Sequence, residues 1–345
     1  MLIILLSLFA TVILFSFLPF NNKIDKFLLF IVLGCVIIFI AAIRGENVDK
    51  DYVSYKELFF LEGFDSYVEV SFLFIKFLVK YFLFNKFLFL ILIYAVLGVS
   101  LKFFAIFEMS EFWFFSILVY LANIYIIQDL TQIRAGVCSA ILLVSLIPLR
   151  QEKNYWFFML ALLAVLFHYS GLILIFIWFL DVNKINKKFW MLIIPFSYLA
   201  YFSHLNLTNF ARLIPVESVQ AKLNFYFLIQ DSVEELKVNV FNILILFRVI
   251  IIYIFFYKLD FFISKSSYFI ILLKIYIISI AVLVITSDVS TISFRLNELL
   301  SISEIILVPF LIYLFKPSYI GKIAVVLFSI ILFYVHLRAE TLLIF

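Results

Sequence analysis

Charged side chains are scarce in this chain of 345 residues. Lys, Arg, Asp and Glu together make up 14% of the sequence, whereas hydrophobic residues make up 67%. A soluble globular domain carries about 25% charged and about 45–50% apolar residues. No soluble core could bury this amount of Phe, Ile and Leu. The composition therefore excludes a soluble protein and indicates a polytopic α-helical membrane protein.

Cysteine and net charge are also low, and each absence excludes a class of protein. Cys35 and Cys138 both lie in apolar runs without neighbouring metal ligands, so a disulfide is not expected. The net charge of +4 is too small and too scattered to indicate nucleic-acid binding. The first apolar run lacks a basic region and a small-residue cleavage site, so residues 1–20 are interpreted as a membrane helix.

Apolar runs of roughly 15–21 residues recur along the chain and predict membrane segments. We predict an all-α fold, a polytopic transmembrane helical bundle of about 11–13 membrane segments with re-entrant or broken helices. No polar stretch is long enough to fold alone, so residues 1–345 should form a single integral-membrane domain with outer loops 44–66 and 203–238. The expected spans are residues 1–20, 27–43, 87–107, 112–127, 135–149, 155–180, 189–202, 239–257, 268–286, 298–315 and 323–337.

Lysines in the short connectors predict which side of the membrane each loop faces. Residues 184–188 and 316–322 are rich in lysine and are expected to face the cytoplasm. Residues 67–84 contain Glu69, Lys76 and Lys80, which favours an interfacial or re-entrant helix over a span.

Residues 155–180 are then expected to form a broken pair of helices. The pair should meet near His168, where Tyr169-Ser170-Gly171 interrupts the apolar run. With this topology the main ionisable candidates lie toward the outer side: Arg44, Asp51, Glu69, Arg134 and His168.

Three polar segments interrupt the otherwise apolar chain. They are Ala41–Tyr55, Asp129–Arg134 and Phe167–Gly171. Ionisable groups at membrane depth are costly, so we interpret the segments as parts of a functional site.

Simpler interpretations of these segments remain open. Residues 41–55 could be an ordinary solvated loop, and Arg44 and Arg134 could be anchors at helix ends. His168 could form a hydrogen bond between helices, and Glu69 could be the partner of one of the arginines.

The order of these segments resembles the EpsG family, the Wzy-like polymerases of bacterial surface polysaccharides. Arg44 precedes Asp51-Tyr52-Val53-Ser54-Tyr55, which is similar to the family's Asp-Tyr-x-x-Tyr element, and Glu69 follows in the next apolar segment. Phe167-His168-Tyr169-Ser170 matches the family's Phe-His-x-Ser element.

Two further elements match the family less completely. Ile133-Arg134 is similar to the start of the family's Ile-Arg-Gln-x-x-Ala element. Ala135 replaces the Gln and Cys138 replaces the final Ala, so the arginine alone carries over. Arg295 resembles a later family arginine.

The resemblance implies glycosyl transfer at the outer face of the bacterial inner (cytoplasmic) membrane. Repeat units linked to undecaprenyl diphosphate would be joined into O-antigen, capsule or exopolysaccharide. The partners implied are this undecaprenyl-diphosphate-linked oligosaccharide and the lipid bilayer, with the chain-length regulator and flippase of the same pathway. We expect no cofactor and no nucleic acid, and we infer no metal, although Asp49 and Asp51 could hold one.

Two chemical demands assign roles to the candidate residues. The acceptor hydroxyl needs a base, for which His168 is the first candidate, with Asp51 or Glu69 as alternatives. The leaving diphosphate needs cations, and arginine binds phosphate oxygens in a bidentate manner. The expected diphosphate contacts are Arg44, Arg134 and Arg295. The expected sugar contacts are Tyr52, Tyr55 and Gln132.

Other functions share this composition. A transporter or lipid-linked-oligosaccharide flippase would also hold an anionic head group, but it favours internal repeats or paired broken helices. A membrane O-acyltransferase could use His168 but would receive acyl groups from the cytoplasmic side. The ligase that moves finished polysaccharide onto lipid A is the nearest enzyme in chemistry.

Overall fold

The computed structural model describes residues 1–20, 22–46, 48–62, 68–203 and 238–339. These residues form helices and connecting segments without any β-strand, which confirms the all-α polytopic bundle. Most of the expected outer loop 203–238 lies outside the described residues. Six helical segments of the described chain are long and apolar enough to cross a membrane. They are Lys23–Ala42, Phe87–Met109, Trp113–Thr131, Ile133–Arg150, Ser290–Leu314 and Ser318–Arg338.

Every expected span falls on a helix, but several helices are shorter than a full crossing. The shorter apolar helices are Leu2–Phe17, Asn154–Phe167, Tyr169–Trp178, Ile243–Tyr257 and Phe269–Ile285. The segment expected to be interfacial contains the 13-residue helix Val70–Phe82, which is not among the candidate spans.

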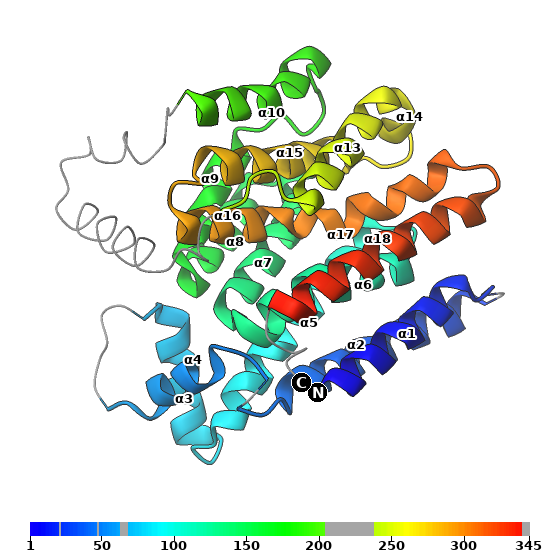
Figure 1. Cartoon of the computed structure of the whole chain (residues 1–345). Coiled ribbons are helices and arrows are strands. Elements are labelled where there is room, and N and C mark those ends of the chain that lie inside the picture. The colour runs from blue at the N-terminus through cyan, green and yellow to red at the C-terminus, as the bar shows by residue number, and fades with distance from the viewer. Residues whose placement is uncertain (21, 47, 63–67, 204–237, 340–345) are drawn as a thin grey trace. The chain divides into compact units, whose positions relative to one another are not determined.

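The described chain divides into two compact units. The first contains Met1–Trp178 and Glu304–Phe345, and the second contains Phe179–Ser303. Figure 1 labels the helices along the chain. The helices of the first unit are α1 (Leu2–Phe17), α2 (Lys23–Ala42), α3 (Tyr52–Phe60), α4 (Val70–Phe82), α5 (Phe87–Met109), α6 (Trp113–Tyr120), η1 (Leu121–Thr131), α7 (Ile133–Arg150), α8 (Asn154–Phe167), η2 (Tyr169–Leu172), α9 (Ile173–Trp178), α17 (Glu304–Leu307), η5 (Val308–Leu314) and α18 (Ser318–Ala339).

The second unit is held by side chains that cap loops and bridge helices. Lys274 Nζ donates to the backbone oxygens of Asp181 and Lys184, and Tyr253 donates to the backbone oxygen of Met191 at 2.9 Å. Its helices are α10 (Lys187–Phe202), α13 (Ile243–Tyr257), α14 (Leu259–Ile263), α15 (Phe269–Ile285), α16 (Ser290–Leu300) and η4 (Ser301–Ser303).

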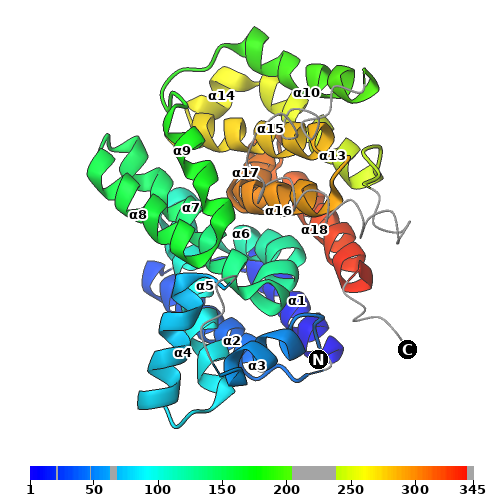
Figure 2. The ribbon, with the colours of Figure 1, turned by 90° about the vertical axis from the view of Figure 1, so that its left-hand side faces the viewer.

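A helical hairpin replaces a single span at residues 154–178, as expected from the sequence. His168 is extended, with φ −159° and ψ 133°, and it ends α8 before the short helix η2 begins. Gly171 packs on the α8 backbone so closely that a Cβ there would lie 2.8 Å from the carbonyl carbon of Ala164. Trp178 Nε1 at the end of α9 donates to Asn154 Oδ1 at the start of α8, at 3.2 Å. The two arms therefore return to the same end, and Figure 2 shows them beside α7.

The helix that begins at Trp113 changes its winding before it reaches the second polar segment. Residues Leu121–Thr131 form a π-helix, and every side chain in it is buried. The Gln132 amide still donates to the backbone oxygen of Ile127 at 2.9 Å, a five-residue step. The span expected from the sequence ends at residue 127, whereas the helix continues to Thr131. Asp129 is consequently buried inside the unit, and π-helical turns often occur at functional sites.

Candidate functional site

Glu69, Arg134 and His168 come from three elements and meet in the first unit. Glu69 directly precedes α4, Arg134 is in the first turn of α7, and His168 is at the break between α8 and η2. Arg134 Nη1 donates to Glu69 Oε2, and His168 Nε2 lies 4.0 Å from Glu69 Oε1. We call these three residues the Arg–Glu–His cluster. One carboxylate thus faces both a permanent cation and a titratable ring.

Tyr55 of α3 supports Arg134 from the other side. The guanidinium lies 5.3 Å from the Tyr55 ring centroid and 5.9 Å from that of Phe72, within the range of cation–π contacts. Burial raises the pKa of Tyr55, and the positive charge of Arg134 opposes this rise. Tyr55 is only 4% exposed, so in this structure it holds the arginine. Its expected contact with sugar stays a prediction.

The hydrogen bonds of His168 define which ring nitrogen carries its proton. The Ser170 amide donates to Nδ1 at 3.2 Å, and a backbone N–H can only donate. Nδ1 is therefore the acceptor, and Ser170 Oγ donates to it at 2.6 Å. The neutral imidazole carries its proton on Nε2, the nitrogen that faces Glu69. Ser170, to which the sequence assigned no role, thus contacts the basic lone pair on His168 Nδ1.

Arg44 follows α2 and is enclosed by the loop that precedes α3. Its Nε donates to Asp49 Oδ2 at 2.8 Å, and Nη1 donates to the backbone oxygen of Ala41 at 2.9 Å. Burial raises the pKa of the Asp49 carboxyl, whereas the charge and hydrogen bond of Arg44 oppose this rise. Tyr52 lies with its ring centroid 6.0 Å from the guanidinium, and the Asp51 amide donates to Asp49 Oδ1 at 3.0 Å.

Arg44 and Arg134 differ in how accessible their side chains are to a substrate. The side chain of Arg44 is 0% exposed and that of its partner Asp49 is 1% exposed, whereas the Arg134 side chain is 23% exposed. Each keeps one buried nitrogen, Arg44 Nη2 and Arg134 Nε, that has no hydrogen-bond partner among the described residues. Buried donors without partners are costly. Within the described chain each arginine therefore has one unpaired donor, but a ligand could reach the side chain of Arg134 alone.

A second buried ion pair lies behind these arginines, and sequence analysis missed it. Lys102 Nζ of α5 donates to Asp129 Oδ1 and Oδ2 at 2.8 and 2.7 Å and to the Gly136 backbone oxygen at 3.0 Å. Tyr120 donates to Asp129 Oδ2 at 2.8 Å. The Asp129 backbone oxygen lies 3.5 Å from Arg44 Nη1. This polar network fixes the π-helix beside Arg44.

Glycine makes room for this ion pair. A Cβ on Gly98 would lie 2.5 Å from Asp129 Oδ1, and one on Gly136 would lie 3.0 Å from the Gln128 backbone oxygen. Side chains larger than hydrogen would displace the carboxylate or the π-helix backbone. The sequence did indicate this ion pair. Lys102 is a lone lysine within an apolar run, and a charge in that position requires a buried partner.

Gln132 and Arg295 are the remaining candidates. Gln132 joins η1 to α7, and its backbone oxygen accepts from the Gly136 amide at 2.9 Å. Arg295 is exposed on α16 of the second unit. Among the described residues, no group of three or more His, Cys, Asp or Glu side chains is placed to hold a metal ion.

The fold and these clusters define a multi-pass membrane protein with an ionisable site at the ends of its helices. The sequence profile of the EpsG family matches residues 27–342, and the chain belongs to this family. Family membership indicates a polymerase-like role in exopolysaccharide synthesis. No curated protein and no solved structure matches the chain.

Proposed function

We propose that this protein joins oligosaccharide repeat units linked to undecaprenyl diphosphate, by glycosyl transfer at the outer face of the bacterial inner membrane. The observation that carries the proposal is the Arg–Glu–His cluster, because it combines a phosphate-binding cation with a base. Arg134 Nη1 is paired with Glu69, and Glu69 is 4.0 Å from the ring of His168. The partners are the lipid-linked oligosaccharide, the surrounding bilayer, and the flippase and chain-length regulator of the same pathway.

Arg134 is the group we assign to the leaving diphosphate. Its side chain is partly exposed, and its Nε has no partner among the described residues. A guanidinium can bind two phosphate oxygens at once, and this interaction strengthens as the diphosphate gains charge in the transition state. Arg44 supports the site from its buried position against Asp49. A direct contact of Arg44 with diphosphate stays a prediction.

His168 receives the proton through Ser170. The acceptor hydroxyl oxygen attacks the anomeric carbon of the donor sugar, and the bond from that carbon to the diphosphate oxygen breaks with its electron pair. The hydroxyl proton passes to Ser170 Oγ as the Ser170 proton passes to His168 Nδ1, 2.6 Å away. The ring then carries a positive charge beside Glu69, which stabilises it. Asp51 and a direct role of Glu69 as base are the alternatives.

The length of surface polysaccharide in a strain that lacks this protein tests the proposal. A polymerase is required for chains of more than one repeat unit. We expect the gel ladder of the parent strain to collapse to a single repeat unit, and the wild-type gene on a plasmid to restore it. Loss of all surface sugar with lipid-linked units retained inside would instead indicate a flippase.

A further inference from the structure

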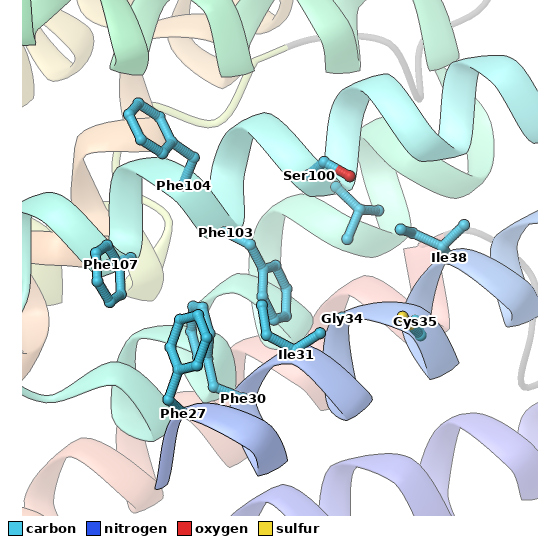
Figure 3. A pocket seen from close by; sticks show the side chains of 11 residues that line it. Phe27, Phe30, Ile31, Gly34, Cys35, Ile38, Ser100, Phe103, Phe104 and Phe107 are labelled. Atoms are coloured by element: carbon cyan, nitrogen blue, oxygen red, sulfur yellow. The ribbon is translucent and has the colours of Figure 1, made fainter. Parts of the chain in front are cut away.

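An apolar groove runs between α2 and α5 in the first unit, and the function proposed above does not use it. The groove has a volume of about 380 Å³, and Figure 3 shows aromatic rings from both helices around it. Gly34 keeps α2 close to Phe103, since a Cβ there would lie 3.1 Å from Phe103 Cδ1. The lining residues include Phe27, Phe30, Cys35, Phe103, Phe104 and Phe107.

A second cavity of about 230 Å³ lies beside the start of α2 and combines aromatic with charged side chains. We call it the cationic pocket. Its lining includes Lys26, Lys322 and Glu111, so its side chains carry one net positive charge. Lys26 Nζ lies 4.2 Å from the ring centroid of Trp113 and donates to the Glu111 backbone oxygen at 3.4 Å. The Glu111 carboxylate accepts a hydrogen bond from Tyr313. The net charge of the pocket favours one singly charged anion.

Trp113 joins the two cavities. It lines the cationic pocket, and its ring centroid lies 5.2 Å from those of Phe30 and Phe107, both of which line the groove. An amphiphile could therefore place its head beside Lys26 and its chain along α2 without leaving the protein surface.

The cationic pocket and Arg44 lie at opposite ends of α2. α2 has 20 residues, which corresponds to about 30 Å, the thickness of the hydrocarbon core. Lys26 lies in its first turn, and Arg44 lies just past its end. Lysine marks the cytoplasmic side, and tryptophan is enriched at the interface. With the topology expected from the lysines, the cationic pocket lies at the level of the inner-leaflet head groups.

We propose that these cavities together bind one anionic glycerophospholipid of the cytoplasmic leaflet. An acyl chain occupies the α2–α5 groove, and the phosphodiester lies between Lys26 and Lys322 beside Trp113. Basic pockets between membrane helices on this side are suited to anionic lipid heads. A phosphodiester carries one negative charge, which matches the net charge of the pocket. The lipid would stabilise the packing of α2 on α5 and is not consumed.

Photocrosslinking tests the head-group pocket. The purified full chain is placed in nanodiscs with phosphatidylglycerol or phosphatidylcholine, each with a diazirine in its acyl chain, and crosslinked peptides are mapped by mass spectrometry. We expect phosphatidylglycerol to label residues of the groove in preference to phosphatidylcholine. Lys26→Gln and Lys322→Gln should each reduce this labelling about fivefold, and Lys258→Gln, in the second unit, should not. Equal labelling by both lipids would overturn the proposal.

A pair of substitutions on one helix tests the groove. Cys35 is exposed and lines it, whereas neighbouring Val36 is exposed on α2 and does not line it. Cys35→Trp should abolish labelling of the groove, and Val36→Trp should preserve it. Both proteins are checked by size-exclusion elution. Equal labelling of the two variants would contradict the assignment of the chain to the groove. Preferential labelling there by photoreactive undecaprenyl diphosphate would also overturn it, because the groove would then serve the substrate.

Discussion

Arg134 Nη1 donates to Glu69 Oε2, and this ion pair joins the first turn of α7 to the residue that precedes α4. The two residues are 65 positions apart in the chain. The same carboxylate lies 4.0 Å from His168 Nε2. A cation that could stabilise a diphosphate and a ring that could accept a proton are therefore connected through one side chain.

Replacing Arg134 by lysine should shorten or abolish the polymer at normal protein levels. Lysine keeps the charge but lacks the planar guanidinium, which pairs with Glu69, lies against the Tyr55 ring and still offers further donors. Each charge-assisted hydrogen bond lost from the transition state costs roughly 1.5–3 kcal/mol, about 10–150-fold in rate. The measurement is the chain-length ladder on a gel. Arg150→Lys, at the other end of α7, is the control. Wild-type lengths from Arg134→Lys would leave Arg134 as a structural anchor.

Replacing Ser170 by alanine should slow chain extension less than replacing His168 does. The alanine removes the hydroxyl relay, but the backbone amide still donates to Nδ1 and keeps the same tautomer. General base catalysis contributes about 10²–10⁴-fold, so His168→Ala should lose most of this factor and Ser170→Ala a part of it. Initial rates with lipid-linked repeat unit measure both. If Ser170→Ala retains the full wild-type rate, the proton goes elsewhere, with Glu69 as the first alternative.

Replacing Gly171 by alanine should misplace His168. The added Cβ would lie 2.8 Å from backbone atoms of Ala164 and Val165, so the α8–η2 hairpin has to open. Gly45→Ala is the matched control, since a Cβ there meets nothing within 4 Å. We expect loss of polymer and faster proteolysis within residues 154–178 for Gly171→Ala alone. Similar behaviour of both glycine variants would mean that the close packing at Gly171 is not required.

The buried ion pair between Lys102 and Asp129 should raise the thermal stability of the protein. Removing one partner leaves a buried charge, which costs about 3–5 kcal/mol. Lys102→Met and Asp129→Asn should each lower the melting temperature of the detergent-solubilised protein. The double variant should recover much of the loss, because no uncompensated charge remains. Lys86→Met, directly before α5, is the control. Simple additivity of the two single effects would show that the ions do not interact.

The sequence was sufficient to predict the helical class and most elements of the site, for a physical reason. In a chain with so few charges, Arg44, Glu69, Arg134 and His168 are conspicuous. The interruption at His168 followed from polar and glycine residues within an apolar run, and the hairpin was confirmed by the contact of Trp178 with Asn154.

The sequence allowed Glu69 as the partner of an arginine, and the structure identifies that arginine as Arg134. The pairing of Arg44 with Asp49 could not be predicted. The sequence did not distinguish the buried Arg44 from the partly exposed Arg134, because exposure depends on the loop that folds over Arg44 and on Asp49. The π-helix was missed because every residue of Leu121–Thr131 is buried, so no solvent-exposed polar face indicates how the segment is wound. The role of Lys102 was missed because its partner, Asp129, lies 27 residues away on another helix.

Polymerisation by the purified protein is the most direct test of the central claim. Lipid-linked repeat unit is extracted from the strain that lacks the protein and is added to liposomes containing the wild-type protein or His168→Ala. Mass spectrometry then follows the glycan length and the release of undecaprenyl diphosphate. We predict products of two or more repeat units, with one undecaprenyl diphosphate released per linkage, from the wild type and almost none from His168→Ala. Unchanged glycan length with folded wild-type protein, or movement across the bilayer without extension, would contradict the account.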